Sequence, residues 1–245
     1  MKKIQTVALT LALISCTNYE IKEIQVSRIS VDSSLNTPLN TPVQILIDSF
    51  KNIMDAKINE EIGVAEHYIP NGKPQSPLGN LTADAMLDFG NKTFKKIDFA
   101  LTNIGGIRNT IDQGPITIGK MYEIFPFENK ITIVEINGKS INKLFASIAE
   151  KGGEGLSKNV ELIIKNNKTE SLKINGKPIV DNKTYRILTS DYLAQGNDGM
   201  TALTEAINIT ESNTQIRDLM IEHIKRLTAE NRKIKSTLDN RIKIK

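Results

Sequence analysis

The chain has 245 residues, of which 39% are hydrophobic and 24% are charged, which is the balance of an ordinary globular protein. Its single cysteine excludes a disulfide framework, so burial has to hold the folded core. The formal net charge of +4 comes from the two ends, because residues 222–245 are strongly basic and Lys2 and Lys3 add to them. The rest of the chain is net negative, which excludes a basic stripe for a nucleic-acid polymer.

The N-terminus has the layout of a bacterial lipoprotein export signal. Two lysines precede an apolar run at residues 7–14, which is far shorter than the roughly 20 residues that span a bilayer. The run ends in Leu13-Ile14, and Ser15 and Cys16 complete the pattern of a lipobox, so we expect a signal peptide over 1–15 and a lipid on Cys16. This predicts an envelope location, on the periplasmic side or the surface of the outer membrane, with lipid as the only membrane contact. An ordinary signal peptide with an incidental cysteine is the alternative.

A polar tether and a helix follow the cysteine. Residues 16–41 contain an Asn-Thr-Pro repeat, a composition typical of a linker. Thr41-Pro42 indicates a helix start, because proline is favoured at the first helical position. Apolar residues then recur at helical spacing, at Val43, Ile47, Phe50, Ile53 and Met54. We expect a single domain over 42–245.

Within this domain, strands and helices alternate irregularly. In chain order we predict a strand over 61–69, a helix over 78–89, a strand over 97–101, a helix over 117–124 and a strand over 131–136. Asn137-Gly138 is predicted as a turn, and Ser140 as the cap of the next helix. Strands around 160–164, 172–174 and 185–189 and a last amphipathic helix with Ile216, Met220, Ile224 and Leu227 complete the series. The predicted class is α+β, with a mixed β-sheet and flanking helices.

Four segments then point to a family. They are LGNLTADA at 78–85, NIGGIR at 103–108, FPFEN at 125–129 and DYLAQGNDG at 191–199. One short glycine-rich pattern would be weak evidence, but four occur here in matching order and spacing. Over about residues 42–243 the chain resembles the C-terminal domain of the 5′-nucleotidase/UDP-sugar hydrolase family. In that family this domain holds the nucleoside part of the substrate.

The resemblance implies a base and ribose site. Phe127 and Tyr192 would be the two rings that sandwich the base, Tyr192 standing where the family usually has Phe, and stacking on a base is worth roughly 1–3 kcal/mol. Asp198 would accept hydrogen bonds from the ribose hydroxyls. Without the resemblance, Phe127 would be interpreted as a core residue beside Pro126, and Asp198 as a turn former. Asn197 replaces a family glycine and is expected to tolerate a positive φ.

The resemblance also implies polar contacts on either side of the ribose. Arg108 would direct its fork of donors toward the sugar–phosphate end, with Asn103 from the same loop and Asn129 as further contacts. The alternatives are a solvated loop arginine and an asparagine that caps a turn. A family arginine on the phosphate side is missing, and Lys92 is its nearest substitute. An aromatic-rich family stretch is replaced by GGEGLS at 152–157, which would alter the base side of the pocket.

The catalytic half of the family is not apparent in this sequence. A two-metal phosphatase site needs several His, Asp and Asn ligands, and this chain has only His67 and His223, in none of the family's metal motifs. Neither histidine has a recognisable nucleophile beside it, so both are interpreted as structural. We predict no metal or cofactor in this chain, with divalent metals in a partner.

Three functions remain open at this point. The first is the nucleotide- or nucleoside-recognition half of a split nucleotidase whose exported metallophosphoesterase chain does the hydrolysis. The second is a lipoprotein that captures nucleotides or nucleosides without turnover. The third is an envelope lipoprotein that keeps the fold and has lost the ligand. A neighbouring gene for an exported metallophosphatase would favour the first.

Overall fold

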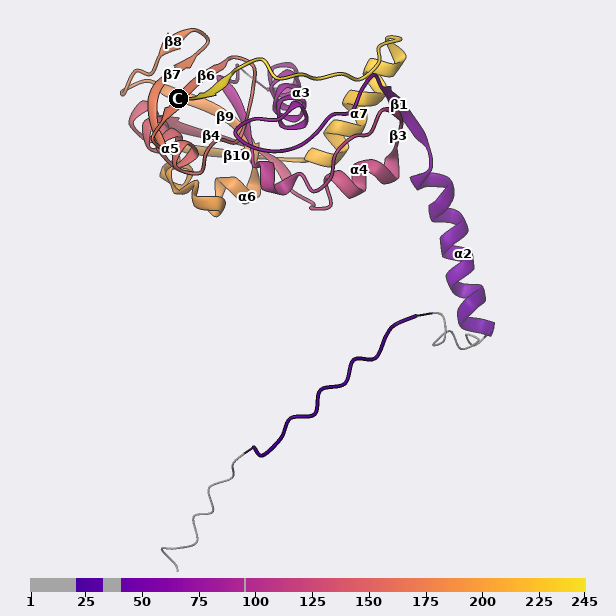
Figure 1. Ribbon diagram of the computed structural model, residues 1–245. Helices are drawn as coiled ribbons and strands as arrows, with labels where there is room; N and C mark the ends of the chain where they lie inside the picture. The colour runs from indigo at the N-terminus through magenta and orange to yellow at the C-terminus, as the bar shows by residue number, and fades with distance from the viewer. Residues whose placement is uncertain (1–20, 33–40, 95) are drawn as a thin grey trace, which may run out of the picture. The chain divides into compact units, whose positions relative to one another are not determined.

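The computed structural model describes residues 21–32, 41–94 and 96–245 (Figure 1). The chain divides into two compact units, Met1–Ile47 and Asp48–Lys245. In the first unit, residues 21–32 form neither helix nor strand and are exposed. The predicted signal peptide, Cys16 and residues 17–20 and 33–40 of the tether lie outside the described residues. Among the residues that are described, no helix is both long enough and apolar enough to cross a membrane.

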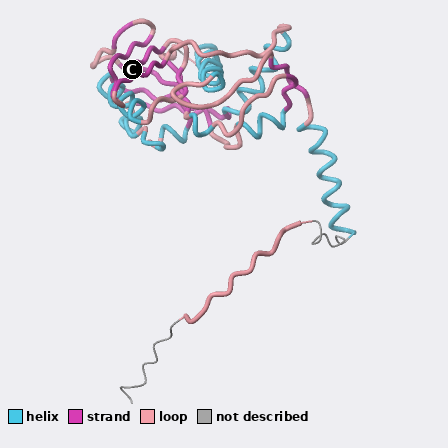
Figure 2. The backbone as a smooth tube through the Cα atoms, viewed as in Figure 1, coloured by secondary structure: helices cyan, strands magenta, loops and turns pink. Residues whose placement is uncertain are grey.

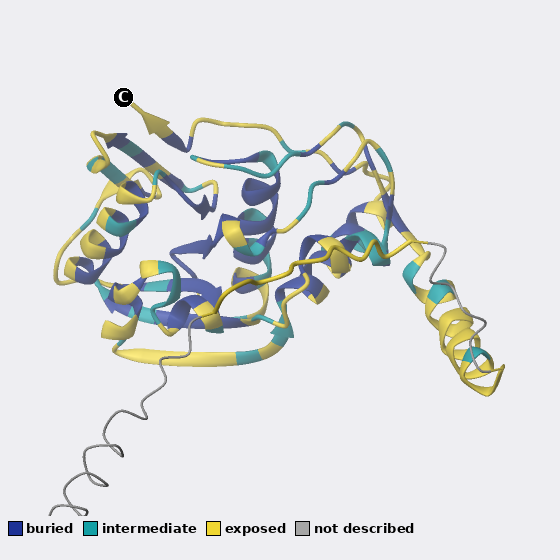
Figure 3. Ribbon diagram, turned by 60° about the horizontal axis from the view of Figure 1, so that its bottom comes forward, coloured by how far each residue is buried: buried dark blue, intermediate teal, exposed yellow. Residues whose placement is uncertain are grey.

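The predicted first helix is present as α2 (Thr41–Ile58), which crosses the boundary between the units. Its apolar positions do not form a core, however. None of its residues is buried, and Phe50, Ile53 and Met54 are exposed (Figure 3). The helical spacing therefore identified the element correctly but gave no information on what its apolar face contacts.

The second unit is built around a five-stranded mixed sheet with the strand order β10-β4-β9-β2-β5. Its strands are β2 (Phe99–Thr102), β4 (Lys130–Asn137), β5 (Gly155–Leu156), β9 (Thr184–Ser190) and β10 (Asn208–Gln215). β2 and β9 are parallel, with Phe99 opposite Ile187, whereas β4 runs antiparallel to β9. Because β2 and β9 point the same way, the residues that follow them emerge at the same end of the sheet.

Two smaller sheets complete the strands (Figure 2). A four-stranded sheet has the order β11-β6-β7-β8, formed by β6 (Val160–Lys165), β7 (Lys168–Ile174), β8 (Lys177–Pro178) and β11 (Ile242–Ile244). A two-stranded antiparallel sheet joins β1 (Glu61–Ala65) to β3 (Gly114–Thr117). The parallel pairing of β11 with β6 brings the chain's last residues into this unit. The predicted α+β class with mixed sheets is confirmed.

Helices cover these sheets and divide the core into two clusters. The longer helices are α3 (Pro77–Thr93), α4 (Ile118–Ile124), α5 (Gly138–Glu150) and α7 (Ile216–Ala229). One cluster packs α3, α4 and α7 around residues such as Met86, Met121 and Met220. The other packs α5 between the large and the four-stranded sheet, where the rings of Phe99 and Phe145 lie 5.5 Å apart. Both clusters are the dark interior of Figure 3.

Several local predictions need correction. Asn137-Gly138 is not a hairpin turn, because Gly138 is the first residue of α5 and the Asn137 side chain caps that helix. Ser140 is therefore not the cap; its backbone N–H donates to Asn137 Oδ1 at 3.0 Å. The strand predicted over 61–69 ends at Ala65, and Ile69 forms only an isolated bridge with Ile111. The sequence reasoning missed β3, β5, β8, β10 and β11, which are short or mainly polar.

Candidate functional site

All six residues proposed to bind a nucleoside line one cavity of about 350 Å³. Its lining consists of Asn103, Gly105, Gly106, Arg108, Phe127, Asn129, Tyr192 and Asp198. These residues come from three segments that are far apart in the sequence. The structure thus brings the predicted set together, and the two glycines are its only additions.

The parallel strands β2 and β9 position two of these segments. Asn103 directly follows β2 and precedes a short 3₁₀ turn, η2 (Ile104–Gly106). Tyr192 lies in the short helix α6 (Asp191–Ala194), which begins where β9 ends and is capped by the side chain of Ser190. The third segment is the loop from α4 to β4, and it carries Phe127 and Asn129. The cavity therefore lies at the carboxyl ends of the two parallel strands.

The two aromatic rings of the cavity are open to solvent. Phe127 is 50% exposed and Tyr192 is 39% exposed, while neighbouring Phe125 is buried at 5%. The alternative that Phe127 is a core residue is therefore wrong, and Phe125 takes that position. In the described part of the chain neither ring stacks on another aromatic side chain. Two exposed rings on one cavity offer apolar faces to a planar ligand.

Two side-chain donors hold the Asp198 carboxylate in place. Asn103 Nδ2 donates to Asp198 Oδ2 at 2.8 Å, and the Tyr192 hydroxyl donates to Asp198 Oδ1 at 3.1 Å. Each carboxylate oxygen still has a lone pair for another donor. The bond to Asp198, and after it the negative charge of that residue, raises the pKa of Tyr192. The carboxylate is thus oriented before any ligand arrives.

The turn that carries Asp198 is left-handed at that residue. Asp198 has φ 52°, and the glycines at 196 and 199 have φ 84° and 70°. The turn-forming role considered for Asp198 thus coexists with its place in the cavity. Asn197 does not take the positive φ expected of it; its side chain instead donates to the Tyr192 carbonyl oxygen at 2.9 Å.

The loop after β2 is supported by two polar side chains, Asn71 and the buried Glu154. Asn71 Nδ2 donates to the carbonyl oxygens of Ile104 and Ile107 at 3.0 and 2.9 Å. Buried Glu154 accepts from the Ile104 N–H at 2.8 Å and pairs with Lys73 at 3.0 Å. The segment 152–157, expected to alter the base side of the pocket, does not line the cavity. It supports the loop that does.

Arg108 presents a largely unengaged guanidinium at the edge of the cavity. Its backbone N–H donates to the Ile124 carbonyl oxygen at 2.8 Å, and its Nη1 donates to the Gly105 carbonyl oxygen at 3.1 Å. Within the described ranges no carboxylate lies within ion-pair distance of Arg108. A guanidinium with unused donors beside a cavity is suited to an oxyanion.

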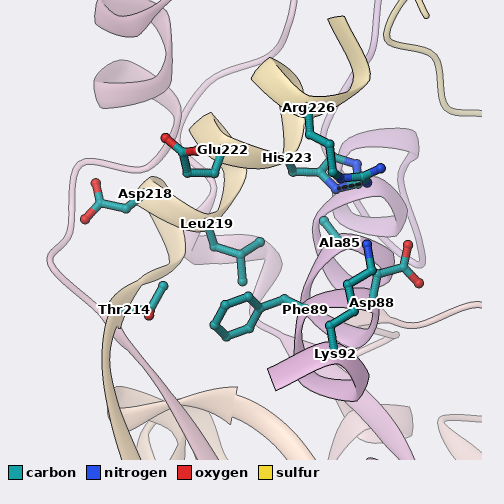
Figure 4. A pocket seen from close by; sticks show the side chains of 10 residues that line it. All are labelled: Ala85, Asp88, Phe89, Lys92, Thr214, Asp218, Leu219, Glu222, His223 and Arg226. Carbon is teal, nitrogen blue, oxygen red and sulfur yellow. Dashed lines mark hydrogen bonds between the residues drawn. The ribbon is translucent and has the colours of Figure 1, made fainter. Parts of the chain in front are cut away.

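Lys92 does not share this cavity. It lies with His223 in a groove of about 440 Å³ between α3 and α7, which is larger than the nucleoside cavity but contains none of the six predicted residues (Figure 4). Arg226 Nη2 is 3.3 Å from His223 Nδ1 there, and burial followed by the charge of Arg226 lowers the pKa of His223. The prediction that Lys92 substitutes for a phosphate-side arginine is therefore wrong, because Lys92 lines the α3–α7 groove and not the nucleoside cavity.

The start of α7 holds the Phe127 loop at both ends, which sequence reasoning missed. Arg217 Nη1 donates to the Phe125 carbonyl oxygen at 3.1 Å, and the Ile216 N–H donates to the Asn129 carbonyl oxygen at 3.0 Å. Arg217 is buried and its guanidinium lies 4.1 Å from the centre of the Tyr122 ring. An arginine in the first turn of a helix looks like a surface residue in sequence, so no pattern could have indicated this role.

The donor set of the cavity does not fit a metal centre. It offers one carboxylate and two side-chain amides, and no His or Cys is among its lining residues. In residues 21–32, 41–94 and 96–245, no three or more His, Cys, Asp or Glu are grouped as metal ligands. His67 Nε2 is 3.0 Å from the Ser236 carbonyl oxygen, which is a structural contact. We therefore derive no metal-dependent step from this chain's residues.

Comparison with known proteins confirms the family resemblance found in the sequence. The model of the family described as 5′-nucleotidase, C-terminal domain, matches residues 56–205. The trifunctional nucleotide phosphoesterase protein YfkN of Bacillus subtilis (strain 168) is 27% identical over 228 residues, which is 85% of this chain and 15% of that protein. Protein UshA of Escherichia coli (strain K12) is 28% identical over 163 residues, 63% of this chain and 29% of that protein.

Among solved structures, the 5′-nucleotidase precursor from Thermus thermophilus superposes with a TM-score of 0.71 at 24% identity. The match covers 83% of this chain and 43% of that one, and at this identity it supports the fold alone. The chain therefore spans less than half the length of each of these proteins.

Proposed function

Because the chain belongs to the family of 5′-nucleotidase C-terminal domains, we propose that it is the nucleotide- or nucleoside-recognition half of a split 5′-nucleotidase-type phosphohydrolase. The observation that carries this proposal is the single cavity in which Phe127, Tyr192 and Asp198 meet. An exported metallophosphoesterase chain would supply the metal ions, which polarise a phosphoryl group and activate water. This chain supplies recognition.

Each group of the cavity has a defined task in this proposal. The base lies between the rings of Phe127 and Tyr192, whose faces are exposed for it. The ribose hydroxyls donate to the open lone pairs of Asp198, which Asn103 and Tyr192 already orient. Preorganised acceptors lose little further freedom on binding, so more of the interaction energy appears as affinity. Arg108 then directs the phosphate end of the ligand toward the partner.

The donor set of the cavity supports the proposed partner. The cavity has one carboxylate and no histidine, whereas a two-metal phosphatase centre requires several such ligands. The relatives named above are also much longer than the part that this chain matches. Both observations support a recognition half whose catalytic half is elsewhere.

A second function is favoured by the completeness of the cavity. Base, ribose and phosphate-side groups all come from this chain, so ligand capture requires no partner residue. The chain would then be a non-catalytic nucleotide- or nucleoside-binding lipoprotein of the cell envelope. Binding without a co-purifying phosphatase would favour this function over the first.

We propose further that a lipid on Cys16 anchors the protein in the envelope, because this cysteine directly follows a short apolar run. Cys16→Ser should shift the protein from the membrane fraction to soluble or unprocessed material. Unchanged partitioning in detergent extraction would show that something else anchors the chain.

Activity assays of the purified chain and of its native complex test the main proposal. The full chain alone, with Mn²⁺, Co²⁺ or Zn²⁺, should release no phosphate from AMP or UDP-glucose above background. The chain recovered by pull-down from its native envelope should bring with it a phosphatase activity that Phe127→Ala weakens. Turnover by the pure chain that is lost on a point mutation within it would overturn the proposal.

A further inference from the structure

A second cleft lies at the opposite end of the two strands that lead to the nucleoside cavity. Asp98 directly precedes β2 and Lys183 directly precedes β9, and both residues line this cleft of about 580 Å³. Because β2 and β9 are parallel, both strands begin at the cleft and end at the cavity. Residues of α3 and β8 contribute to its walls, and both elements are labelled in Figure 1.

Lysines from four separate segments converge on the cleft. They are Lys96, Lys158, Lys177 and Lys183, and only two carboxylates, Asp88 and Asp98, line the same cleft. Lys183 Nζ pairs with Asp98 at 3.4 Å, and Lys158 Nζ is 3.9 Å from Asp88. Within the described chain, no carboxylate lies within ion-pair distance of Lys96 or Lys177. The lining therefore has an excess of two positive charges.

The carboxylate at the base of the cleft is buried and its charge is paired with a lysine. Asp98 Oδ2 accepts from the Arg186 N–H at 2.9 Å, and Oδ1 accepts from Lys183. The carbonyl oxygen of Asp98 accepts from Asn159 Nδ2. Arg186 Nη1 also donates to the Lys96 carbonyl oxygen at 3.0 Å, which fixes the backbone that carries one of the free lysines. Asp98 thus organises the base of the cleft and repels an incoming anion less than an open carboxylate would.

Three asparagine side chains line the cleft, and the amide oxygen of each accepts a hydrogen bond from the protein. Asn91 Oδ1 accepts from the Ile97 N–H at 3.0 Å. Asn159 Oδ1 accepts from Ser157 Oγ at 2.7 Å, and Asn175 Oδ1 accepts from Asn159 Nδ2 at 3.1 Å. Asn159 Nδ2 is itself engaged, because it donates to the Asp98 carbonyl oxygen and to Asn175 Oδ1, and Asn175 Nδ2 donates to the Asp98 carbonyl oxygen at 3.5 Å. Within the described residues, the amide donors that remain for a ligand are those of Asn91 Nδ2 and the second hydrogen of Asn175 Nδ2.

We propose that this cleft binds a small organic phosphate, a phosphomonoester dianion whose charge matches the excess of two lysines. Its unused groups are donors, and a phosphate offers three strong acceptor oxygens to them. The volume exceeds that of a bare phosphate and is within the range of small-molecule sites. Leu87, Ile97 and Pro178 provide apolar wall for the organic part. The site is separate from the nucleoside cavity, and the proposal does not rest on the function proposed for that cavity.

The test is an NMR titration of the full chain, labelled with ¹⁵N, with glycerol 3-phosphate at constant ionic strength. Saturable shifts should appear at the amides of Asn91, Lys96 and Lys177, and the amides of Asn103 and Tyr192 should not move. Replacing both free lysines, Lys96→Gln with Lys177→Gln, should weaken binding by about tenfold or more, since two charge-assisted contacts are lost. Both lysines are exposed, so the spectrum outside the cleft should be unchanged.

The matched control removes the same charge elsewhere. Lys139→Gln with Lys168→Gln replaces two exposed lysines that do not line the cleft, and should change the dissociation constant by less than about twofold. Equal weakening by the two double variants would reduce the effect to general charge attraction and overturn the proposal. So would shifts that do not saturate, or equally strong binding of inorganic sulfate, which has the same charge but no organic part. Adenosine binding, read from Asn103 and Tyr192, reports independently on the other site.

Discussion

The two ends of the parallel strands β2 and β9 differ in which hydrogen-bonding groups remain open. At the carboxyl ends, Asp198 is oriented by two donors and keeps acceptor capacity, and it shares a cavity with the exposed rings of Phe127 and Tyr192. At the amino ends, Asp98 is buried and engaged, while Lys96 and Lys177 remain free. One end therefore suits a ligand with a planar ring and hydroxyl donors, and the other suits an anion.

This difference shows that a residue type alone does not indicate a site's chemistry. Asp98 and Asp198 are both carboxylates next to the same strand pair, yet one is an internal brace and the other faces a cavity. Each accepts one hydrogen bond at each carboxylate oxygen, and what separates them is exposure and charge: Asp98 is buried and paired with Lys183, whereas Asp198 lines an open cavity and is held by two neutral donors. Substitutions that remove a charge, an acceptor or a ring at one end test the comparison.

The largest effect is expected from Tyr192→Ala. It removes one stacking face, worth roughly 1–3 kcal/mol, and also the hydroxyl that holds Asp198, worth about 1 kcal/mol more. Calorimetry with adenosine should show this loss in the full chain. The double variant of Lys96 and Lys177 should leave adenosine affinity unchanged, and an equal loss in that variant would abolish the distinction between the two ends.

Asp198→Asn should come next, with an effect that depends on the sugar. The carboxylamide offers one acceptor oxygen where the carboxylate offers two, and loss of a charged hydrogen bond costs about 1.5–3 kcal/mol. Adenosine should therefore lose more affinity than 2′-deoxyadenosine. The measured quantity is the ratio of the two dissociation constants. A parallel loss for both ligands would show that Asp198 supports the turn without reading the ribose.

Tyr192→Phe separates the ring from its hydroxyl. From stacking alone the cost should be small, since the ring is retained, but the structure shows the hydroxyl donating to Asp198 at 3.1 Å. We expect a loss of about 1 kcal/mol for adenosine and less for 2′-deoxyadenosine. An identical affinity of wild type and variant for both ligands would mean that Asn103 alone suffices to orient the carboxylate.

The smallest effect concerns pH. The pKa of Tyr192 is raised from its ordinary value of 10.0 by the bond to Asp198, so the neutral, donating phenol persists as the pH rises toward that value. Adenosine affinity should accordingly stay constant between pH 7 and about 9. The contribution of the hydroxyl should be lost only above the ordinary tyrosine pKa. A decline in calorimetric affinity that begins below pH 9 and is absent in Tyr192→Phe would contradict this assignment.

The candidate site was more predictable than its surroundings. Four motifs in register place Asn103, Phe127 and Asp198 near one another. The motifs at 103–108 and 191–199 follow the parallel strands β2 and β9, and the motif at 125–129 precedes the antiparallel strand β4, so all three meet at one end of the sheet. The bond from Tyr192 to Asp198 could not be predicted, since it depends on the left-handed turn at 196–199. Lys92 was assigned to the wrong surface because sequence position gives its helix but not the face that meets α7.

For the fold, strongly periodic segments were identified and polar strands were not. β10, with the sequence NITESNTQ, has little apolar alternation, because it is an exposed edge strand that β4 pairs on one side only. Asn137-Gly138 was taken for a hairpin turn because both turns and helix caps favour asparagine. The lysine cleft had no sequence signal, since its lysines come from separate segments and Lys96 and Lys177 are 81 positions apart in the sequence.

The central claim, that the cavity after β2 and β9 binds a nucleoside, is tested most directly by an NMR titration of the ¹⁵N-labelled full chain with adenosine. The account predicts saturable shifts at the amides of Asn103, Phe127 and Tyr192, and an affinity weaker by roughly 1–3 kcal/mol in Phe127→Ala, which removes one stacking face. Phe89→Ala, which truncates a ring in the α3–α7 groove, should bind as the wild type does. Shifts that fail to saturate, or equal affinity of wild type and Phe127→Ala, would contradict the claim.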